Sequence, residues 1–356
     1  MLAQVNNLLI GDTQIRDRKI DSLTRSSRRL ASMRLLKTCL VTLIVLGAYT
    51  SILHAQGLGP SQQYDNGYNP QVAMDGTTVV EVHNAGTSFG RMWYHVGHIN
   101  GSTLTWSSSH PMDNGYNPKV AVVGSTVVEV HNGGNSFGPM WYHVGHINAD
   151  DTITWTPTYY PYENGYNPSV AAYGSTVVEV HNGGNSFGPM WYKLGQINAN
   201  NTITWGPGYP YENGFNPSVA VSGSVQLVVV EVHNGQASEG PTWYKVGYFY
   251  PNNTIYWGPG YQYDYGWNPS VTHAYNNCGF QSMEVHNAGT SFGPMWYHPP
   301  SNGGHTLYNI LWLPSQFFDN GFNPSVATST YGVVQVHNGG TFEGPMWYSF
   351  TPSNCG

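Results

Sequence analysis

The sequence predicts an all-β protein built as a six-bladed β-propeller, with four antiparallel strands in each blade. The first observation is a unit of about 50 residues that occurs six times between residues 57 and 356. The second is the composition, because 43 glycines, 23 prolines and 26 tyrosines suit short strands and tight turns and would disrupt long helices. The third is that each unit contains four strand-like runs separated by turn residues, which is typical of a propeller blade.

Each unit begins with a turn motif, defined here as an acidic residue followed by Asn-Gly-aromatic-Asn-Pro. The six copies start at Asp65, Asp113, Glu163, Glu212, Asp264 and Asp319. The glycine of the motif allows a positive φ, and the proline is expected to set the start of the first strand. In the third unit the four strand-like runs are residues 169–173, 176–181, 190–194 and 202–205.

The two ends of the repeated region are expected to meet. The sixth unit stops after Phe350 without a fourth strand, whereas residues 58–65 align without a gap on residues 205–212. An N-terminal strand is therefore expected to complete the last blade, which closes the ring and removes an open sheet edge. In such a meander the turn motif and the loop after the second strand lie at the same end. These segments hardly vary among the six units, so their residues are expected to gather on one face.

The first 56 residues differ from the repeats and carry eight of the 12 Lys and Arg residues. A basic stretch is followed by an uncharged run at residues 39–53, which is typical of a secretory signal peptide. Cleavage is expected after Ala55 or Gln56, and an uncleaved anchor is the alternative. Because the basic stretch is unusually long, Met33 would make a more ordinary start of the signal peptide. The protein is therefore expected to be secreted or periplasmic, with residues 57–356 forming the propeller.

The exported part is acidic. Residues 57–356 carry four Lys and Arg against 16 Asp and Glu, a formal net charge of −12. So few cations cannot neutralise phosphates, which argues against nucleic acid and anionic membranes as partners. The same part keeps two cysteines, and an even pair in a secreted chain predicts a disulfide between Cys278 and Cys355.

The strongest candidate site is a Glu-x-His-Asn sequence in the second strand of each unit. The six His-Asn pairs are His83/Asn84, His131/Asn132, His181/Asn182, His233/Asn234, His286/Asn287 and His337/Asn338, and in the sixth unit the Glu is replaced by Gln335. One interpretation is ligand binding by the imidazole or the amide; the other is that these groups bond loop backbone or the adjacent blade. Six near-identical copies argue against catalysis, and the neutral Gln335 argues against a metal.

The aromatic residue of the turn motif is the second candidate, and it is Tyr68, Tyr116, Tyr166, Phe215, Trp267 or Phe322 in the six units. These rings are expected on the constant face, where a pyranose could stack its apolar face while Asn and His bind its hydroxyls. The alternative is that the ring packs between blades, because the exchange among Tyr, Phe and Trp preserves bulk and not the hydroxyl. The Trp-Tyr pairs of the third strand and the fourth-strand tryptophans are expected in the core between blades.

Several signals of other functions are weak or missing in the sequence. His95-Val-Gly-His98 has a spacing that suits a metal, but the third unit has Lys193 and Gln196 at these positions. The sequence contains no Gly-x-Ser-x-Gly elbow, no phosphate-binding loop and no EF-hand pattern. We therefore expect no enzyme activity, no cofactor and no bound metal.

The repeats resemble those of the bacterial β-propeller lectins of the PLL type. The segments that carry the resemblance are Gly67-Tyr-Asn-Pro-Gln-Val-Ala73, Glu81-Val82 and Met92-Trp93, with their counterparts in the other units. That family has seven blades and binds fucose in pockets between neighbouring blades, whereas this chain has six units. The resemblance implies binding of glycans, among them fucosylated or other cell-surface saccharides.

The sequence therefore predicts a secreted, lectin-like propeller that binds glycans weakly at several equivalent sites on one face, so that linked sites strengthen binding. One alternative is a scaffold or adhesion module whose repeats serve packing only. Another is a secreted hydrolase or lyase with its site in the central channel, which would require acidic residues there that are unique to one unit.

Overall fold

The computed structural model describes residues 57–156, 160–223, 226–250, 252–276, 279–299, 305–306 and 308–353. Contacts between Cα atoms divide the chain into two compact units, Met1–His54 and Ala55–Gly356, and all described residues belong to the second. The expected signal peptide and the expected pair Cys278 and Cys355 lie outside the described residues. Over the described part, no helix has the length and apolarity that a membrane crossing requires.

Each repeat contributes three main strands to one antiparallel sheet. The first strands contain the turn motif and are β1 (Gln62–Asp75), β5 (His110–Val123), β9 (Tyr160–Tyr173), β13 (Tyr209–Gly223), β17 (Tyr261–Asn276) and β22 (Gln316–Ser329). The second strands are β2 (Thr78–Asn84), β6 (Thr126–Asn132), β10 (Thr176–Asn182), β14 (Leu227–Asn234), β18 (Gly279–Asn287) and β23 (Gly332–Asn338). The third strands are β3 (Gly90–Asn100), β7 (Gly138–Ile147), β11 (Gly188–Ile197), β15 (Gly240–Tyr250), β19 (Gly293–His298) and β24 (Gly344–Pro352).

Short strands lie at the margin of this sheet. Four of them pair with the ends of third strands: β4 (Thr103–Trp106), β8 (Ile153–Trp155), β12 (Ile203–Trp205) and β16 (Thr254–Trp257). In the fifth repeat β20 (His305–Thr306) and β21 (Asn309–Ile310) form a separate two-stranded sheet.

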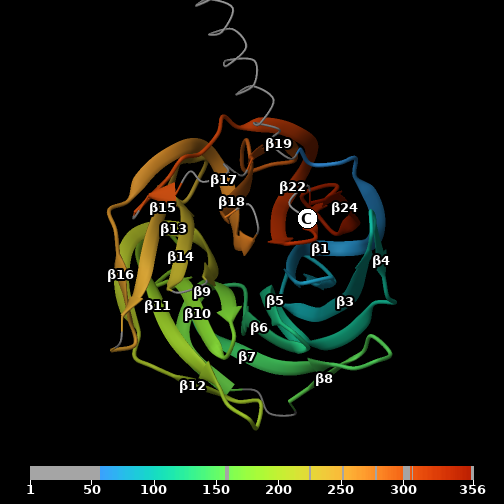
Figure 1. Cartoon of the computed structure of the whole chain (residues 1–356), viewed down its shortest axis with the longest axis horizontal. Helices are drawn as coiled ribbons and strands as arrows, with labels where there is room; N and C mark the ends of the chain where they lie inside the picture. The colour runs from blue at the N-terminus through green and yellow to red at the C-terminus, as the bar shows by residue number, and fades with distance from the viewer. Residues whose placement is uncertain are drawn as a thin grey trace, which may run out of the picture. The chain divides into compact units, whose positions relative to one another are not determined.

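The expectation of a six-bladed propeller with four strands in each blade is wrong. The main sheet has 22 strands; apart from the four short ones, its strands pair in a single closed circuit, an antiparallel barrel of 18 strands. The hydrogen-bonded ladders do not stop between repeats, so the sheet does not divide into separate blades. The six repeats follow one another around a central axis, and β1 lies beside β24 (Figure 1).

The turn motif explains why the sheet is continuous. In β5 the residues before Tyr116 pair with β3, and the residues from Tyr116 onward pair with β6. The register shifts between Tyr116 and Lys119, where Asn117 has a φ of 51°. The motif therefore forms a bulge that bends the strand without ending it. What the sequence suggests as a fourth strand and a new first strand is one strand shared by two neighbouring repeats.

The ring is closed by its N-terminal segment. Residues 62–67 of β1 pair with β24, and the following residues of β1 pair with β2. The segment thus has the same two neighbours as every other first strand. Closure leaves the main circuit without an open edge, which removes a row of unpaired backbone groups.

The apolar core lies between neighbouring repeats. In one cluster Val80 and Val82 of β2 pack with Val120 and Val122 of the next repeat, and with Ile153 beyond them. The second strands are valine-rich and buried on both sides, as their burial patterns show. Each repeat therefore completes the core of its neighbour, so the ring is stabilised as a whole. As expected, tyrosines of the third strands such as Tyr94 and the tryptophans of the short strands belong to these clusters. The third-strand tryptophans, such as Trp93, were also expected there but belong to none of the clusters of the described residues.

Candidate functional site

The asparagine that ends each second strand holds the next repeat. Asn84 Nδ2 donates to the carbonyl oxygen of Gly115 (3.1 Å), and Asn84 Oδ1 accepts from the backbone N–H of Asn117 (3.2 Å). The same two bonds occur at the other five positions. The bond donated by Nδ2 is 3.0–3.2 Å long, and the bond accepted by Oδ1 is 2.7–3.2 Å long. We call these residues the latch asparagines: Asn84, Asn132, Asn182, Asn234, Asn287 and Asn338. All six are fully buried.

The histidine of the same sequence is bonded within its own strand. His83 Nδ1 lies 3.1 Å from a carboxylate oxygen of Glu81, and both side chains are buried. The imidazole also packs on the turn motif, because a Cβ placed on Gly67 would lie 2.5 Å from His83 Cδ2. The motif therefore needs glycine for this close approach. The motif does not use the positive φ that glycine allows: the residue in the left-handed region is the second asparagine, such as Asn69 with a φ of 55°.

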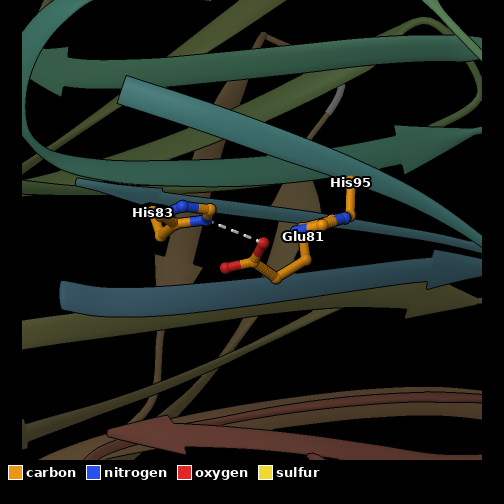
Figure 2. A group of neighbouring side chains, drawn as sticks. All are labelled: Glu81, His83 and His95. Carbon is orange, nitrogen blue, oxygen red and sulfur yellow. Dashed lines mark hydrogen bonds and ion pairs between the residues drawn. The ribbon is translucent and has the colours of Figure 1, made fainter. Parts of the chain in front are cut away.

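A second charged group accompanies each buried glutamate, and it comes from the third strand. His95 lies opposite Glu81 in the β2–β3 ladder and contacts Asp65 of the turn motif, with 2.7 Å between Nε2 and Oδ2. Figure 2 shows Glu81 on β2 between His83 and His95. Burial disfavours the charge of Asp65, but hydrogen bonds from His95 and Asn66 and the nearby histidines outweigh it and lower the pKa of Asp65. Burial also opposes protonation of His95, but its bond to Asp65 and the charge of Glu81 raise its pKa.

The third-strand residue and the acidic residue of the turn motif change together among the repeats. In the first, second and fifth repeats the third-strand residue is His95, His143 or His298, and its partner is an aspartate. In the third repeat Lys193 pairs with Glu163 at 2.9 Å, and in the fourth Lys245 pairs with Glu212 at 2.8 Å. Histidine therefore occurs with the shorter acid and lysine with the longer one.

The sixth repeat lacks the charged group and also lacks the glutamate. Ser349 stands opposite Gln335 in the β23–β24 ladder, and Gln335 Oε1 lies 3.1 Å from His337 Nδ1. Burial lowers the pKa of His337 to about 4, against the opposing effect of Asp319. A buried carboxylate is thus present in the repeats that place a histidine or lysine beside it, which indicates charge compensation.

Three of these clusters have donor atoms close enough to surround a metal ion: Glu81/His83/His95, Glu129/His131/His143 and Asp264/His286/His298. In the third and fourth repeats, however, a lysine replaces the third-strand histidine. An ammonium group cannot donate a lone pair to a metal, but it can replace a protonated imidazole in an ion pair. The comparison among repeats therefore favours an ion-pair network over a metal site.

The turn-motif aromatics come together around the axis, where they line one cavity of about 320 Å³. We call them the aromatic cup: Tyr68, Tyr116, Tyr166, Phe215, Trp267 and Phe322. Ring centroids of neighbouring repeats are 6.5 Å apart for Tyr166 and Phe215, and 5.9 Å apart for Phe215 and Trp267. The structure therefore brings the predicted aromatics into one shared site. It places the predicted histidines and latch asparagines behind this site, in the buried interior.

The second asparagines of the turn motifs form a ring within the same cavity. This asparagine ring is Asn69, Asn117, Asn167, Asn216, Asn268 and Asn323, all with φ between 49° and 55°. Each side-chain amide donates to the carbonyl oxygen of the next one, from Asn69 onward to Asn323. Asn69 Oδ1 accepts from Gln71 Nε2 at 3.1 Å. The ring thus presents a circle of oriented amides around the axis.

The residue after the proline of the turn motif was not singled out by the sequence. It is Gln71, Lys119, Ser169, Ser218, Ser270 or Ser325, and Gln71 and Lys119 line both the aromatic cup and a smaller cavity of about 120 Å³.

Exposed phenylalanines were also missed. Phe89, Phe137, Phe187, Phe292 and Phe342 lie in the loops after the second strands. Comparison of the repeats could have revealed both, because Gln71 and Lys119 depart from serine and the phenylalanine recurs.

No protein-family model matches this chain, and no curated protein matches it. The resemblance to PLL-type lectins therefore rests on the repeat motifs alone. The structure is similar to one described as the structure of YjhT, with a TM-score of 0.50, 7% identity and coverage of 80% of this chain and 95% of that chain. This is a similarity of fold.

Two further similarities are weaker. A xylan β-1,4-xylosidase from Bacillus halodurans has a TM-score of 0.41 and 11% identity, over 65% of this chain and 52% of that chain. A protein from Lactobacillus plantarum has a TM-score of 0.42 and 10% identity, over 70% and 74%.

Proposed function

We propose that this protein binds carbohydrate in the aromatic cup and does not cleave it. The observation that carries the proposal is that six aromatic side chains, one from each repeat, line a single cavity together with the asparagine ring. An aromatic ring offers a surface for the apolar face of a pyranose, and amides and phenols can bind its hydroxyls. The volume of about 320 Å³ is within the range of small-ligand pockets, which is about 300–1,000 Å³.

The chemistry of the lining supports binding over hydrolysis at this place. Glycoside hydrolysis commonly uses two carboxyl groups on either side of the bond that is cleaved. The described residues that line the aromatic cup include no aspartate and no glutamate. The glutamates next to His83 and its counterparts are fully buried behind the cup and are engaged by histidines.

The proposal differs from six separate pockets. Because the six aromatics line a single cavity, the cup offers one composite site in each protein molecule. A multivalent contribution would have to come from elsewhere, and exposed phenylalanines recur in the loops after the second strands of five repeats. Export by the N-terminal segment, and with it a role outside the cell, is part of the proposal and rests on the sequence of residues 1–56.

Binding to a glycan array, followed by titration of the best ligands, tests the proposal. The informative variant is Trp267→Ala, which removes a partly exposed ring from the cup. Its matched control is Tyr331→Ala, which removes an exposed aromatic in the turn between β22 and β23. We expect Trp267→Ala to weaken binding about tenfold or more with little change in melting temperature, and the control to bind normally.

The scaffold hypothesis makes the opposite prediction. If the aromatics serve packing only, Trp267→Ala should lower the melting temperature, and the wild-type protein should bind no saccharide on the array above the background. That result would refute carbohydrate binding in the cup. The resemblance to fucose-binding lectins is tested on the same array by comparing fucosylated glycans with others.

A further inference from the structure

The residue after the proline of the turn motif lines the cavities on the axis and differs among the repeats. In four repeats it is serine, and its hydroxyl accepts a bond from the backbone of the next repeat, as Ser169 Oγ does from Val219 N at 3.2 Å. In the first and second repeats it is Gln71 and Lys119. Both residues line the aromatic cup, as Ser270 of the fifth repeat also does, but their side chains are longer and carry an amide and an ammonium group. The sixfold arrangement is therefore broken at one place by an amide and an ammonium group.

Gln71 and Lys119 form a connected pair. Lys119 Nζ donates to Gln71 Oε1 at 2.5 Å, and Gln71 Nε2 donates to Asn69 of the asparagine ring at 3.1 Å. An ammonium group has three donors, and the bond to Gln71 uses one of them. The described residues that line the two cavities around this pair include no carboxylate.

Lys119 differs in this respect from the other two lysines of the described part. Lys193 and Lys245 each contact a glutamate, at 2.9 and 2.8 Å. Burial lowers the pKa of Lys119 to about 8, so most of the side chains still carry a charge at neutral pH. An otherwise acidic protein thus holds a cation in its central cavity with an amide oxygen as its partner. An anion that enters the cavity would supply the missing countercharge.

The aromatic cup is also uneven, and its uneven side coincides with this pair. The first three repeats contribute Tyr68, Tyr116 and Tyr166, each with a hydroxyl. The last three repeats contribute Phe215, Trp267 and Phe322. Lys119 and Gln71 belong to the first two repeats, so the cation and the phenols share one half of the cavity. A ligand with one apolar face and one charged, hydroxylated edge matches this distribution.

We propose that the aromatic cup selects saccharides that carry a carboxylate, such as a hexuronic acid, and that Lys119 and Gln71 bind that carboxylate. This inference rests on the proposed function and adds the ligand class. The sugar ring lies against the apolar half of the cup, and its carboxylate lies on the side of the first two repeats. The carboxylate takes the free donors of Lys119 in a charge-assisted hydrogen bond.

Three ligands of equal ring size separate the contributions: glucuronate, its methyl ester and glucose. They are titrated into the wild-type protein and into Lys119→Ser, which introduces the side chain that four repeats already hold. Lys119→Arg serves as a second variant that keeps the charge, and Arg91→Ala is the control, because it removes an exposed cation outside the cavity. Circular dichroism verifies that each variant is folded.

We expect the wild-type protein and Arg91→Ala to prefer glucuronate over its ester by about tenfold or more. Lys119→Ser should bind both ligands equally, with its affinity for glucose retained, and Lys119→Arg should keep at least part of the preference. If the sugars bind without a preference for the acid, or if the preference survives in Lys119→Ser, the inference is wrong and carbohydrate binding stands. If none of the three ligands and no glycan on the array binds, both proposals are wrong.

Discussion

Asn338 at the end of β23 in the last repeat donates a hydrogen bond of 3.1 Å to the carbonyl oxygen of Gly67 in the first repeat, across 271 positions of sequence. Its Oδ1 atom accepts from the backbone N–H of Asn69 at 2.7 Å. The same side chain therefore satisfies a donor and an acceptor on either side of Tyr68. The aromatic cup and the closure of the ring depend on the same residue type, repeated six times.

The variant Asn338→Ala should destabilise the protein. The change leaves a buried carbonyl oxygen and a buried N–H without partners, each at a cost of about 1–3 kcal/mol. Thermal unfolding followed by circular dichroism measures the effect. Asn66→Ala is the matched control, because Asn66 is an exposed asparagine of the same turn motif. Equal melting temperatures for the two variants would show that the latch does not hold the ring.

Charge compensation in the interior can be tested in the sixth repeat. Gln335→Glu would place a buried carboxylate opposite Ser349, where the other repeats have histidine or lysine. We expect a loss of roughly 3 kcal/mol, because an unpaired buried charge is costly. Adding S349H reproduces the arrangement of the first, second and fifth repeats, where the turn motif also carries an aspartate, and should restore a large part of the loss. A double-mutant cycle measures the coupling, and additive effects would contradict the interpretation.

The repeat, the turn motif and the common face of the aromatics could be predicted from sequence because they depend on periodicity. The continuity of the sheet could not. Asn-Gly-Tyr-Asn-Pro is typical of a turn that ends a strand, yet Asn117 takes the left-handed conformation and the motif becomes a bulge inside β5. Whether such a segment ends a strand or bends it depends on the residues that pack against it. Here the bond from the Asn117 N–H to Asn84 Oδ1 holds the bulge.

The candidate site was only partly predictable for a similar reason. The alternation of Glu81 and His83 along β2 shows that they share a side of the strand, but their burial depends on packing from β3 and the turn motif. Lys119 was visible as a departure from serine, but no motif marks it. Its candidate role follows from its place in a cavity that segments of all six repeats line together.

The stability of the protein should decrease on both sides of neutral pH. The pKa of His95 is raised, so its contribution is complete below the unfolded value of about 6.5 and is lost as the pH rises through the raised value. The pKa of Asp65 is lowered, so its contribution is present above about 3.9 and is lost as the pH falls through the lowered value. His337, whose pKa is lowered to about 4, also disfavours folding in acid, because the unfolded chain binds its proton more readily.

Melting temperatures measured across the pH range test this. The double variant His95→Lys/Asp65→Glu copies the pair of the third repeat. It removes one of the three histidines whose pKa is raised, which are His95, His143 and His298. Its loss of stability between neutral and mildly alkaline pH should be smaller than that of the wild-type protein. An unchanged alkaline profile would contradict the assignment to these histidines.

Lys119 should destabilise the unliganded protein, because burial lowers its pKa to about 8 from an ordinary value near 10.5. Below pH 8 the folded protein bears the full cost of a buried charge, and this cost shrinks as the pH rises toward the unfolded value. Lys119→Met should therefore melt higher than the wild-type protein at pH 7, with a difference that decreases at higher pH.

The other titratable groups that line the two cavities are Tyr68, Tyr116, Tyr166 and His273. Burial raises the pKa of the three phenols, which keeps them neutral in this range. A difference that is absent at pH 7, or that grows with pH, would show that Lys119 is not a buried cation.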